Sequence, residues 1–144
     1  MAKVTARASK RLGAPPARVL EFLRDYRSAR PRILPGNYSL YRVEAGGEGA
    51  GTVLAYHFAA GRRERDYRLT VEESNDGLRE RDQLSSFVST WMVAPNGTES
   101  NVTLEGSWDG TGGVAGIFEG LFAPLVLRRV YGEILTRLAA ELEG

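Results

Sequence analysis

The chain has 144 residues, which suits one domain able to bury roughly 70% of its unfolded surface. Hydrophobic residues make up 42% and charged residues 26%, the net charge is +1, and cysteine is absent. These values are typical of a globular domain; they exclude disulfides and thiolate metal sites, and no apolar run approaches the ~20 residues that a membrane span needs.

The predicted elements begin with a strand over residues 3–12, where apolar and polar side chains alternate. Pro15 and Pro16 suit the entrance of a helix, and an apolar face at helical spacing follows over residues 19–26. The segment RPRILPG is too closely bounded by prolines for more than a turn or two of helix. Two short helices are therefore expected after the first strand.

Between residues 38 and 108 the apolar period changes to two, and turn signals recur about every ten residues. This pattern predicts an antiparallel meander of six strands. The stretch 114–143 is helical again, but Pro124 would break a continuous helix. We expect a short helix ending near Phe122 and a long helix with Pro124 in its first turn.

The turns of the meander decide which side chains share a face. A four-residue loop at 59–62 pairs Phe58 with Arg63 and places His57, the only histidine, opposite Glu64 on a polar face. A loop at 74–77 would pair Val71 with Glu80 and Leu69 with Asp82. Asn96-Gly97 is the pair that type I′ hairpin turns prefer. For the strand near residue 40, two registers stay open, with either Tyr38 and Leu40 or Tyr41 and Val43 facing inward.

A single long helix must cover the apolar face of this wide sheet, so the sheet has to curl around it and leave a core or a cavity between them. Aromatic and small side chains alternate on that face, which is compatible with a pocket for an apolar ligand. A plain packed core is the alternative and the commoner role of buried aromatic residues. The candidate ligand-binding residues are Leu54, Tyr56, Phe58, Arg65, Tyr67, Leu69, Phe87, Ser89, Trp91, Leu104, Phe118, Phe122 and Tyr131.

Glu80 and Asp82 are the candidate catalytic residues, because the register places both on the apolar face. Burial raises the pKa of a carboxyl group and would let it act as a general acid or base. Arg65 and Tyr67 on the neighbouring strand could bind an enolate or a carboxylate. The alternative is that both carboxylates simply pair with arginine, and a slip of one residue in the 74–77 loop would turn them outward.

Other kinds of site find little support. GTGGVAG lacks the spacing of a phosphate-binding loop, one histidine without cysteine does not suggest a metal site, and no serine triad can be built around His57. Arginines cluster at residues 24–32 and would suit phosphate groups, but acidic residues nearly balance the basic ones. We therefore predict no metal, no cofactor and no nucleic-acid partner. Because no signal peptide is evident, we expect a cytoplasmic location. A homodimer stays open.

Strand, helix pair, six-stranded meander and long C-terminal helix together resemble the START-like helix-grip fold of the SRPBCC (Bet v 1-like) superfamily, and in particular its polyketide cyclase/dehydrase group. The resemblance covers nearly the whole chain. The segments that carry it are APPARVLEFLRDYRSARPRILPG, GAGTVLAYHF, RRERDYRLTVEE, WMVAPNGTESNVTLEGSW and LFAPLVLRRVYGEILTRLAAELE.

The resemblance implies a single α+β ligand-binding domain over residues 1–144, in which a curved antiparallel sheet of six to seven strands wraps around the C-terminal helix. It also implies a cavity between sheet and helix. Members of the superfamily include cyclases that fold poly-β-ketone chains and carriers of lipids and hormones. We predict a protein that binds an apolar, lipid-like or aromatic small molecule. The alternatives are a cyclase/dehydrase that uses cavity carboxylates and a protein-interaction module.

Overall fold

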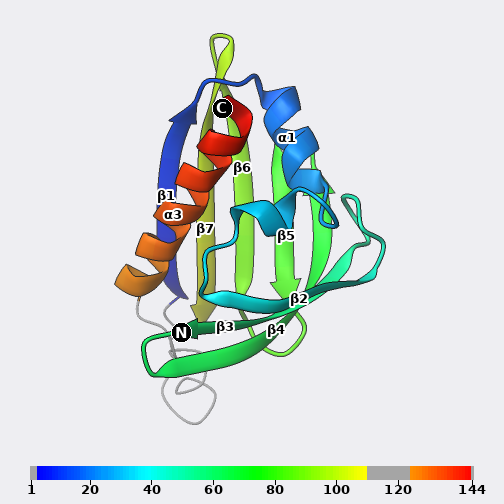
Figure 1. Ribbon diagram of the computed structural model, residues 1–144, viewed down its shortest axis with the longest axis vertical. Coiled ribbons are helices and arrows are strands. Elements are labelled where there is room, and N and C mark those ends of the chain that lie inside the picture. Colours follow the sequence, from blue (N-terminus) through cyan, green and yellow to red (C-terminus); the bar gives the residue numbers. More distant parts are fainter. Residues whose placement is uncertain (1–2, 110–123, 144) are drawn as a thin grey trace.

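The computed structural model describes residues 3–109 and 124–143. Within these residues seven antiparallel strands form one sheet in the order β1-β7-β6-β5-β4-β3-β2, and the long helix α3 (Pro124–Glu143) covers its inner face (Figure 1). Helix α1 (Pro16–Arg24) and the 3-10 turn η1 (Arg30–Ile33) connect β1 to β2. The strands are β1 (Lys3–Leu12), β2 (Tyr38–Ala45), β3 (Val53–Ala60), β4 (Arg63–Ser74), β5 (Gly77–Asp82), β6 (Val88–Asn96) and β7 (Glu99–Asp109).

The predicted α+β helix-grip architecture is confirmed, including the first strand, the helix with the short turn after it, and the six-stranded meander. Strands β2 to β7 are joined by successive hairpins, and β1 closes the sheet by pairing with β7. In Figure 1 strands β2 to β4 run across the lower part of the molecule, while β1 and β5 to β7 stand upright. The sheet is therefore strongly bent, and its concave side faces α3 and η1.

Helix α3 packs mainly along β1 and also contacts η1 and β7. Its buried residues recur every three or four positions, as expected for an amphipathic helix that lies on a sheet. The side chains of α3 that are buried in the core are Leu127, Val130, Tyr131, Ile134, Leu135, Leu138 and Ala139.

No helix in the described part of the chain is both long and apolar enough to cross a bilayer.

The predicted four-residue loop at 59–62 is wrong. The hairpin closes through two residues, Gly61 and Arg62, so that Phe58 pairs with Arg65 and not with Arg63. Gly61 has a φ of +64°, which a two-residue hairpin turn requires at its first position and which glycine adopts without a steric penalty. His57 consequently lies opposite Asp66 and not Glu64. The displacement is two residues, so every side chain keeps the face that was predicted for it.

In the hairpin between β4 and β5, Val71 pairs with Glu80 and Leu69 with Asp82, as predicted. The hairpin between β6 and β7 differs from the prediction in its turn. Between β6 and β7, Asn96 pairs with Glu99, so the turn consists of Gly97 and Thr98 and not of Asn96 and Gly97. Of these two turn residues only Gly97 has a positive φ, of +64°, which fits a type II′ turn better than a type I′ turn.

The open register of β2 is resolved by a β-bulge. The pairing with β3 shifts between Ser39 and Arg42, and Leu40 there has a φ of +55° and is 73% exposed. The extra residue turns the strand, so that Tyr38 faces the core before the bulge and Tyr41 and Val43 face it afterwards. Each of the two competing patterns is therefore right for part of the strand.

Gly77 provides a direct test of this packing. A Cβ atom at this position would collide with the backbone carbonyl oxygen of Trp91 on β6. We expect Gly77→Ala to lower the free energy of unfolding by about 1–3 kcal/mol, because a main-chain atom cannot move without shifting its strand.

The matched control is Gly132→Ala on α3, since a Cβ atom there would meet no atom of another described element within 4 Å. Alanine favours helix over glycine, so this variant should gain up to about 1 kcal/mol. Urea denaturation followed by circular dichroism measures both changes. Equal stability of the two variants would contradict the close approach of β5 to β6 at Gly77.

Candidate functional site

A cavity lies between the concave face of the sheet, η1 and α3. Its volume is about 30 Å³, enough for one or two water molecules. Among the described residues, the walls are mostly aromatic and aliphatic, with one arginine, one glutamate and one serine. The lining residues are Arg30, Ile33, Leu34, Tyr38, Tyr41, Leu54, Tyr56, Glu80, Phe87, Ser89, Trp91, Leu104, Tyr131 and Ile134.

About half of the candidate ligand-binding residues line this cavity, namely Leu54, Tyr56, Phe87, Ser89, Trp91, Leu104 and Tyr131. Phe58, Tyr67 and Leu69 are buried in the core but do not line it, and neither does Arg65. Phe118 and Phe122 lie outside the described residues, as does the predicted short helix that ends near Phe122.

The sequence-based reasoning missed the side of the cavity that η1 and the start of β2 provide. Ile33 and Leu34 lie in the RPRILPG segment, which was assigned only a short helical turn. The signal was the apolar pair itself, because Ile33 and Leu34 stand between Pro31 and Pro35 in a segment too short for a helix with its own buried face. Tyr38 and Tyr41 belonged to the two alternative registers of β2, so the sequence did not show that both face inward.

Glu80 lies in a buried polar cluster in the cavity wall. The Tyr26 hydroxyl donates to Glu80 Oε2 at 2.6 Å, and the Ser89 hydroxyl donates to Oε1 at 2.9 Å. The Arg30 Nη1 atom completes an ion pair with Oε2 at 2.9 Å. Glu80 and Arg30 are only 3% and 6% exposed, so this pair is almost entirely removed from water.

Arg30 is held in place by several neighbours. Its Nη1 atom also donates to the Leu23 carbonyl oxygen at 3.0 Å, and its guanidinium carbon lies 4.6 Å from the centre of the Tyr26 ring and 5.1 Å from that of Trp91. Burial lowers the pKa of Arg30, but the negative charge of Glu80 and other neighbours raise it by more, so its net pKa is raised. Arg30 therefore stays positively charged.

Asp82 also faces inward, as predicted, but it belongs to a different network. It accepts hydrogen bonds from the Arg68 backbone amide at 3.0 Å and from the Ser85 hydroxyl at 2.6 Å, and its Oδ2 atom lies 3.5 Å from Arg65 Nη2. The Ser85 contact holds the loop between β5 and β6, and the other two contacts join Asp82 to β4. Asp82 does not line the cavity, so the two candidate catalytic carboxylates do not converge on one point.

Four tyrosines line the described wall of the cavity: Tyr38, Tyr41, Tyr56 and Tyr131. Burial, the largest cause, raises the pKa of Tyr38, Tyr56 and Tyr131 above the usual value of 10, and neighbouring tyrosines raise it further. Tyr41 behaves similarly, because burial raises its pKa to about 12. These hydroxyls therefore remain neutral at physiological pH.

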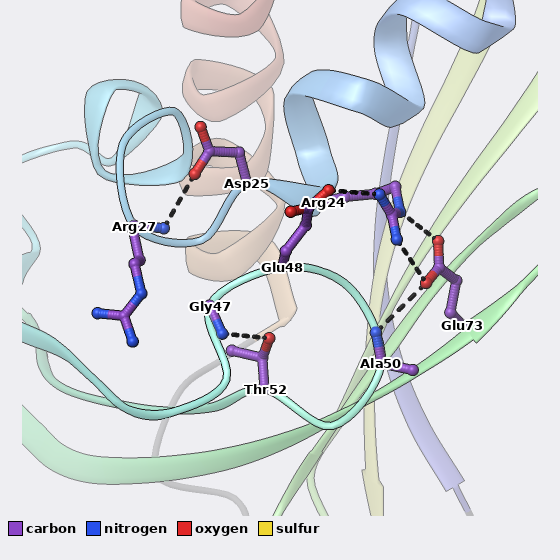
Figure 2. A network of polar contacts seen from close by, with 8 residues as sticks. All are labelled: Arg24, Asp25, Arg27, Gly47, Glu48, Ala50, Thr52 and Glu73. Carbon is purple, nitrogen blue, oxygen red and sulfur yellow. Dashed lines mark hydrogen bonds and ion pairs between the residues drawn. The ribbon is translucent and has the colours of Figure 1, made fainter.

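The arginines at residues 24–32 are engaged within the molecule. Figure 2 shows Arg24 between Glu48 and Glu73, with Nη1–Oε1 and Nε–Oε2 distances of 3.0 and 2.5 Å. Arg27 donates to the Gly46 carbonyl oxygen, and Arg32 pairs with Glu141 at 2.8 Å. These contacts tie the end of α1 and η1 to the glycine-rich loop before β3 and to α3, and thereby hold Arg30 against the sheet.

His57 lies on the convex face of the sheet, away from the cavity. Its Nδ1 atom is 2.7 Å from Asp66 Oδ1, and its Nε2 atom is 3.7 Å from Glu64 Oε1. This agrees with the prediction that His57 contacts acidic side chains across the strands on a polar face. The partner directly opposite is Asp66.

A comparison with protein families finds a match over residues 1–143 to the family described as "Polyketide cyclase / dehydrase and lipid transport". The chain belongs to this family. It is thus one of the SRPBCC, or Bet v 1-like, proteins, as the resemblance implied. No curated protein matches the chain.

Solved structures of this fold include one with substantial sequence similarity. The NMR structure of the KanY protein (ms6282) is 45% identical over 100% of both chains, with a TM-score of 0.90. TTHA0849 from Thermus thermophilus is 20% identical over 97% of both chains, with a TM-score of 0.77. Norcoclaurine synthase from Thalictrum flavum, solved with dopamine and hydroxybenzaldehyde, is 15% identical over 99% of this chain and 87% of its own, with a TM-score of 0.71. At these identities the last two show a shared fold alone.

Proposed function

We propose that this polyketide cyclase/dehydrase family protein binds an apolar or aromatic small molecule in the cavity between the sheet, η1 and α3. The observation that carries the proposal is the lining, in which aromatic and aliphatic side chains surround a few buried polar groups. Ligand pockets of proteins have this composition. The family's description and the aromatic ligands in the norcoclaurine synthase structure support the same reading.

The volume of the cavity sets a condition on binding. Pockets for drug-sized ligands measure about 300–1,000 Å³, far more than the 30 Å³ present here. Binding therefore requires side chains to move. Ile33 and Leu34, which follow each other in and just after η1, are the candidates to yield, because they belong to a short turn and not to the hydrogen-bonded sheet.

Titration with the neutral apolar probe N-phenyl-1-naphthylamine tests the proposal. We expect saturable binding at one site per chain and a change in tryptophan emission, because Trp91 is in the cavity wall. Trp91→Phe should remove most of that change. Trp108→Phe is the matched control, since Trp108 is equally buried but does not line the cavity, and it should preserve the change. Absence of saturable binding would overturn the proposal.

A cyclase or dehydratase activity is the second candidate, and the observation that favours it is Glu80, the one carboxylate in the described cavity lining. The same experiment can be extended with a poly-β-ketone thioester. Simple binding predicts no conversion. If conversion occurs and Glu80→Gln slows it about 10²–10⁴-fold with probe binding intact, the carboxylate acts as a general acid or base and the enzyme function is correct. Asp82→Asn is the control, because Asp82 lies outside the lining.

A further inference from the structure

We propose that the cavity selects ligands that carry a neutral hydrogen-bond acceptor, such as a ketone or aldehyde oxygen, and that the indole N–H of Trp91 and the Nε–H of Arg30 recognise this group. The inference rests on the proposed function and names the chemistry of its ligand.

The first observation is a pair of donors without acceptors. Trp91 Nε1 and Arg30 Nε are buried, and neither has a hydrogen-bond partner among the described residues. Both residues line the same cavity, and the Arg30 guanidinium carbon lies 5.1 Å from the centre of the Trp91 ring. Buried donors are nearly always satisfied in folded proteins, because an unmade hydrogen bond loses the interaction that water provided. Because both residues belong to the wall of one cavity, a group that enters the cavity is the candidate acceptor for these donors.

The second observation concerns charge. The positive charge of Arg30 is already neutralised by Glu80, at 2.9 Å from its Nη1 atom, and Glu80 lines the cavity as well. A ligand carboxylate would bring a second negative charge next to Glu80 without a further cation in the described lining to balance it, and burying such a charge is costly. A carbonyl oxygen can accept hydrogen bonds from these donors without this penalty, because it carries no net charge.

The remaining polar groups of the wall also favour an acceptor. The Glu80 oxygens already accept hydrogen bonds from Tyr26 and Ser89 in addition to the ion pair. Tyr56 and Tyr131 keep their hydroxyl protons, because burial raises the pKa of both, and their hydroxyls offer further donors. The described lining therefore offers an incoming carbonyl oxygen several donors, while the Glu80 oxygens already have protein partners. Water can satisfy the two orphan donors before a ligand binds, and a ligand that displaces the water must replace its oxygen.

Two ligands of nearly equal shape separate this inference from the proposed function. In 2-acetylnaphthalene a carbonyl oxygen occupies the position that a CH₂ group has in 2-isopropenylnaphthalene. Isothermal titration calorimetry on the full chain should show that the ketone binds about 10-fold more tightly than the hydrocarbon. Trp91→Phe removes the indole N–H and retains an aromatic ring. It should weaken ketone binding about 3- to 10-fold and change hydrocarbon binding by less than about 2-fold.

Trp108→Phe is the control, because Trp108 Nε1 is another buried donor without a described partner, but Trp108 does not line the cavity. It should leave the preference for the ketone unchanged. Equal affinities of ketone and hydrocarbon, in the natural chain and in Trp91→Phe alike, would overturn the inference and leave the proposed function intact. If neither naphthalene binds, the proposed function fails as well. Tighter binding of 2-naphthoate than of the ketone would overturn the preference for a neutral group.

Discussion

Arg30→Met should lower the free energy of unfolding by about 3–5 kcal/mol, the usual result of removing one partner from a buried ion pair. The substitution leaves the Glu80 carboxylate 3% exposed and without its cation, although Tyr26 and Ser89 still donate hydrogen bonds to it. Methionine approximates the length of the arginine stem, so little of the loss comes from an empty space. Urea denaturation at pH 7 measures the change.

Arg32→Met is the matched control two residues away. Arg32 pairs with Glu141 at 2.8 Å, but its side chain is 53% exposed, and ion pairs in such surroundings contribute less than about 1 kcal/mol. A second variant separates charge from shape. Combining Arg30→Met with Glu80→Gln removes the unpaired charge and should restore part of the lost stability. If Arg30→Met costs no more than Arg32→Met, Glu80 does not depend on Arg30.

The two-residue periodicity correctly predicted which side chains face inward, because an error of two residues in a turn leaves every side chain on the same face. The strand pairing predicted from the 59–62 loop is two residues off, and Tyr56 and Phe58 still face the core. A slip of one residue in the 74–77 loop would instead have turned Glu80 and Asp82 outward. The bulge at Leu40 shows the limit of the pattern, because a two-residue repeat cannot represent an inserted residue.

The same periodicity could not predict the polar cluster around Glu80 in the cavity wall. Tyr26 and Glu80 are 54 residues apart in the sequence, and no local pattern indicates that they share a hydrogen bond. Arg30 is one of four arginines of similar context at residues 24–32, and only the packing of η1 on the sheet distinguishes it from the other three, which are less buried. The two inward carboxylates likewise differ only in their surroundings, since Glu80 reaches the cavity and Asp82 is held by the Ser85 loop.

The volume of the cavity depends on a still finer level of structure. Gly106 has no side chain, and a Cβ atom there would collide with the Tyr131 hydroxyl. The tyrosine thus fills space that a pattern of large and small residues would assign to a ligand. Whether such a face is a core or a pocket is decided by side-chain conformations, which periodicity does not specify.

The buried tyrosines lead to the other large expected effect, a loss of stability in alkali. Burial raises the pKa of Tyr26, Tyr56 and Tyr131, and the charge of Glu80 adds to this at Tyr26. In the unfolded chain each tyrosine ionises near pH 10. Because the pKa is higher in the folded state, the contribution to stability is complete below pH 10 and is lost as the pH rises above it.

At pH 11 ionisation stabilises the unfolded chain by about 1.4 kcal/mol per tyrosine, and the three together lower the free energy of unfolding by about 4 kcal/mol relative to pH 8. The free energy of unfolding of a typical domain is about 5–15 kcal/mol, so the midpoint of urea denaturation should fall sharply from pH 8 to pH 11. Tyr131→Phe isolates the cause, because it removes one ionisable hydroxyl and leaves the ring in the core. This variant should lose about 1.4 kcal/mol less than the natural chain between pH 8 and pH 11. An identical loss in both proteins would mean that Tyr131 ionises as readily in the fold as outside it, and that water reaches this wall of the cavity.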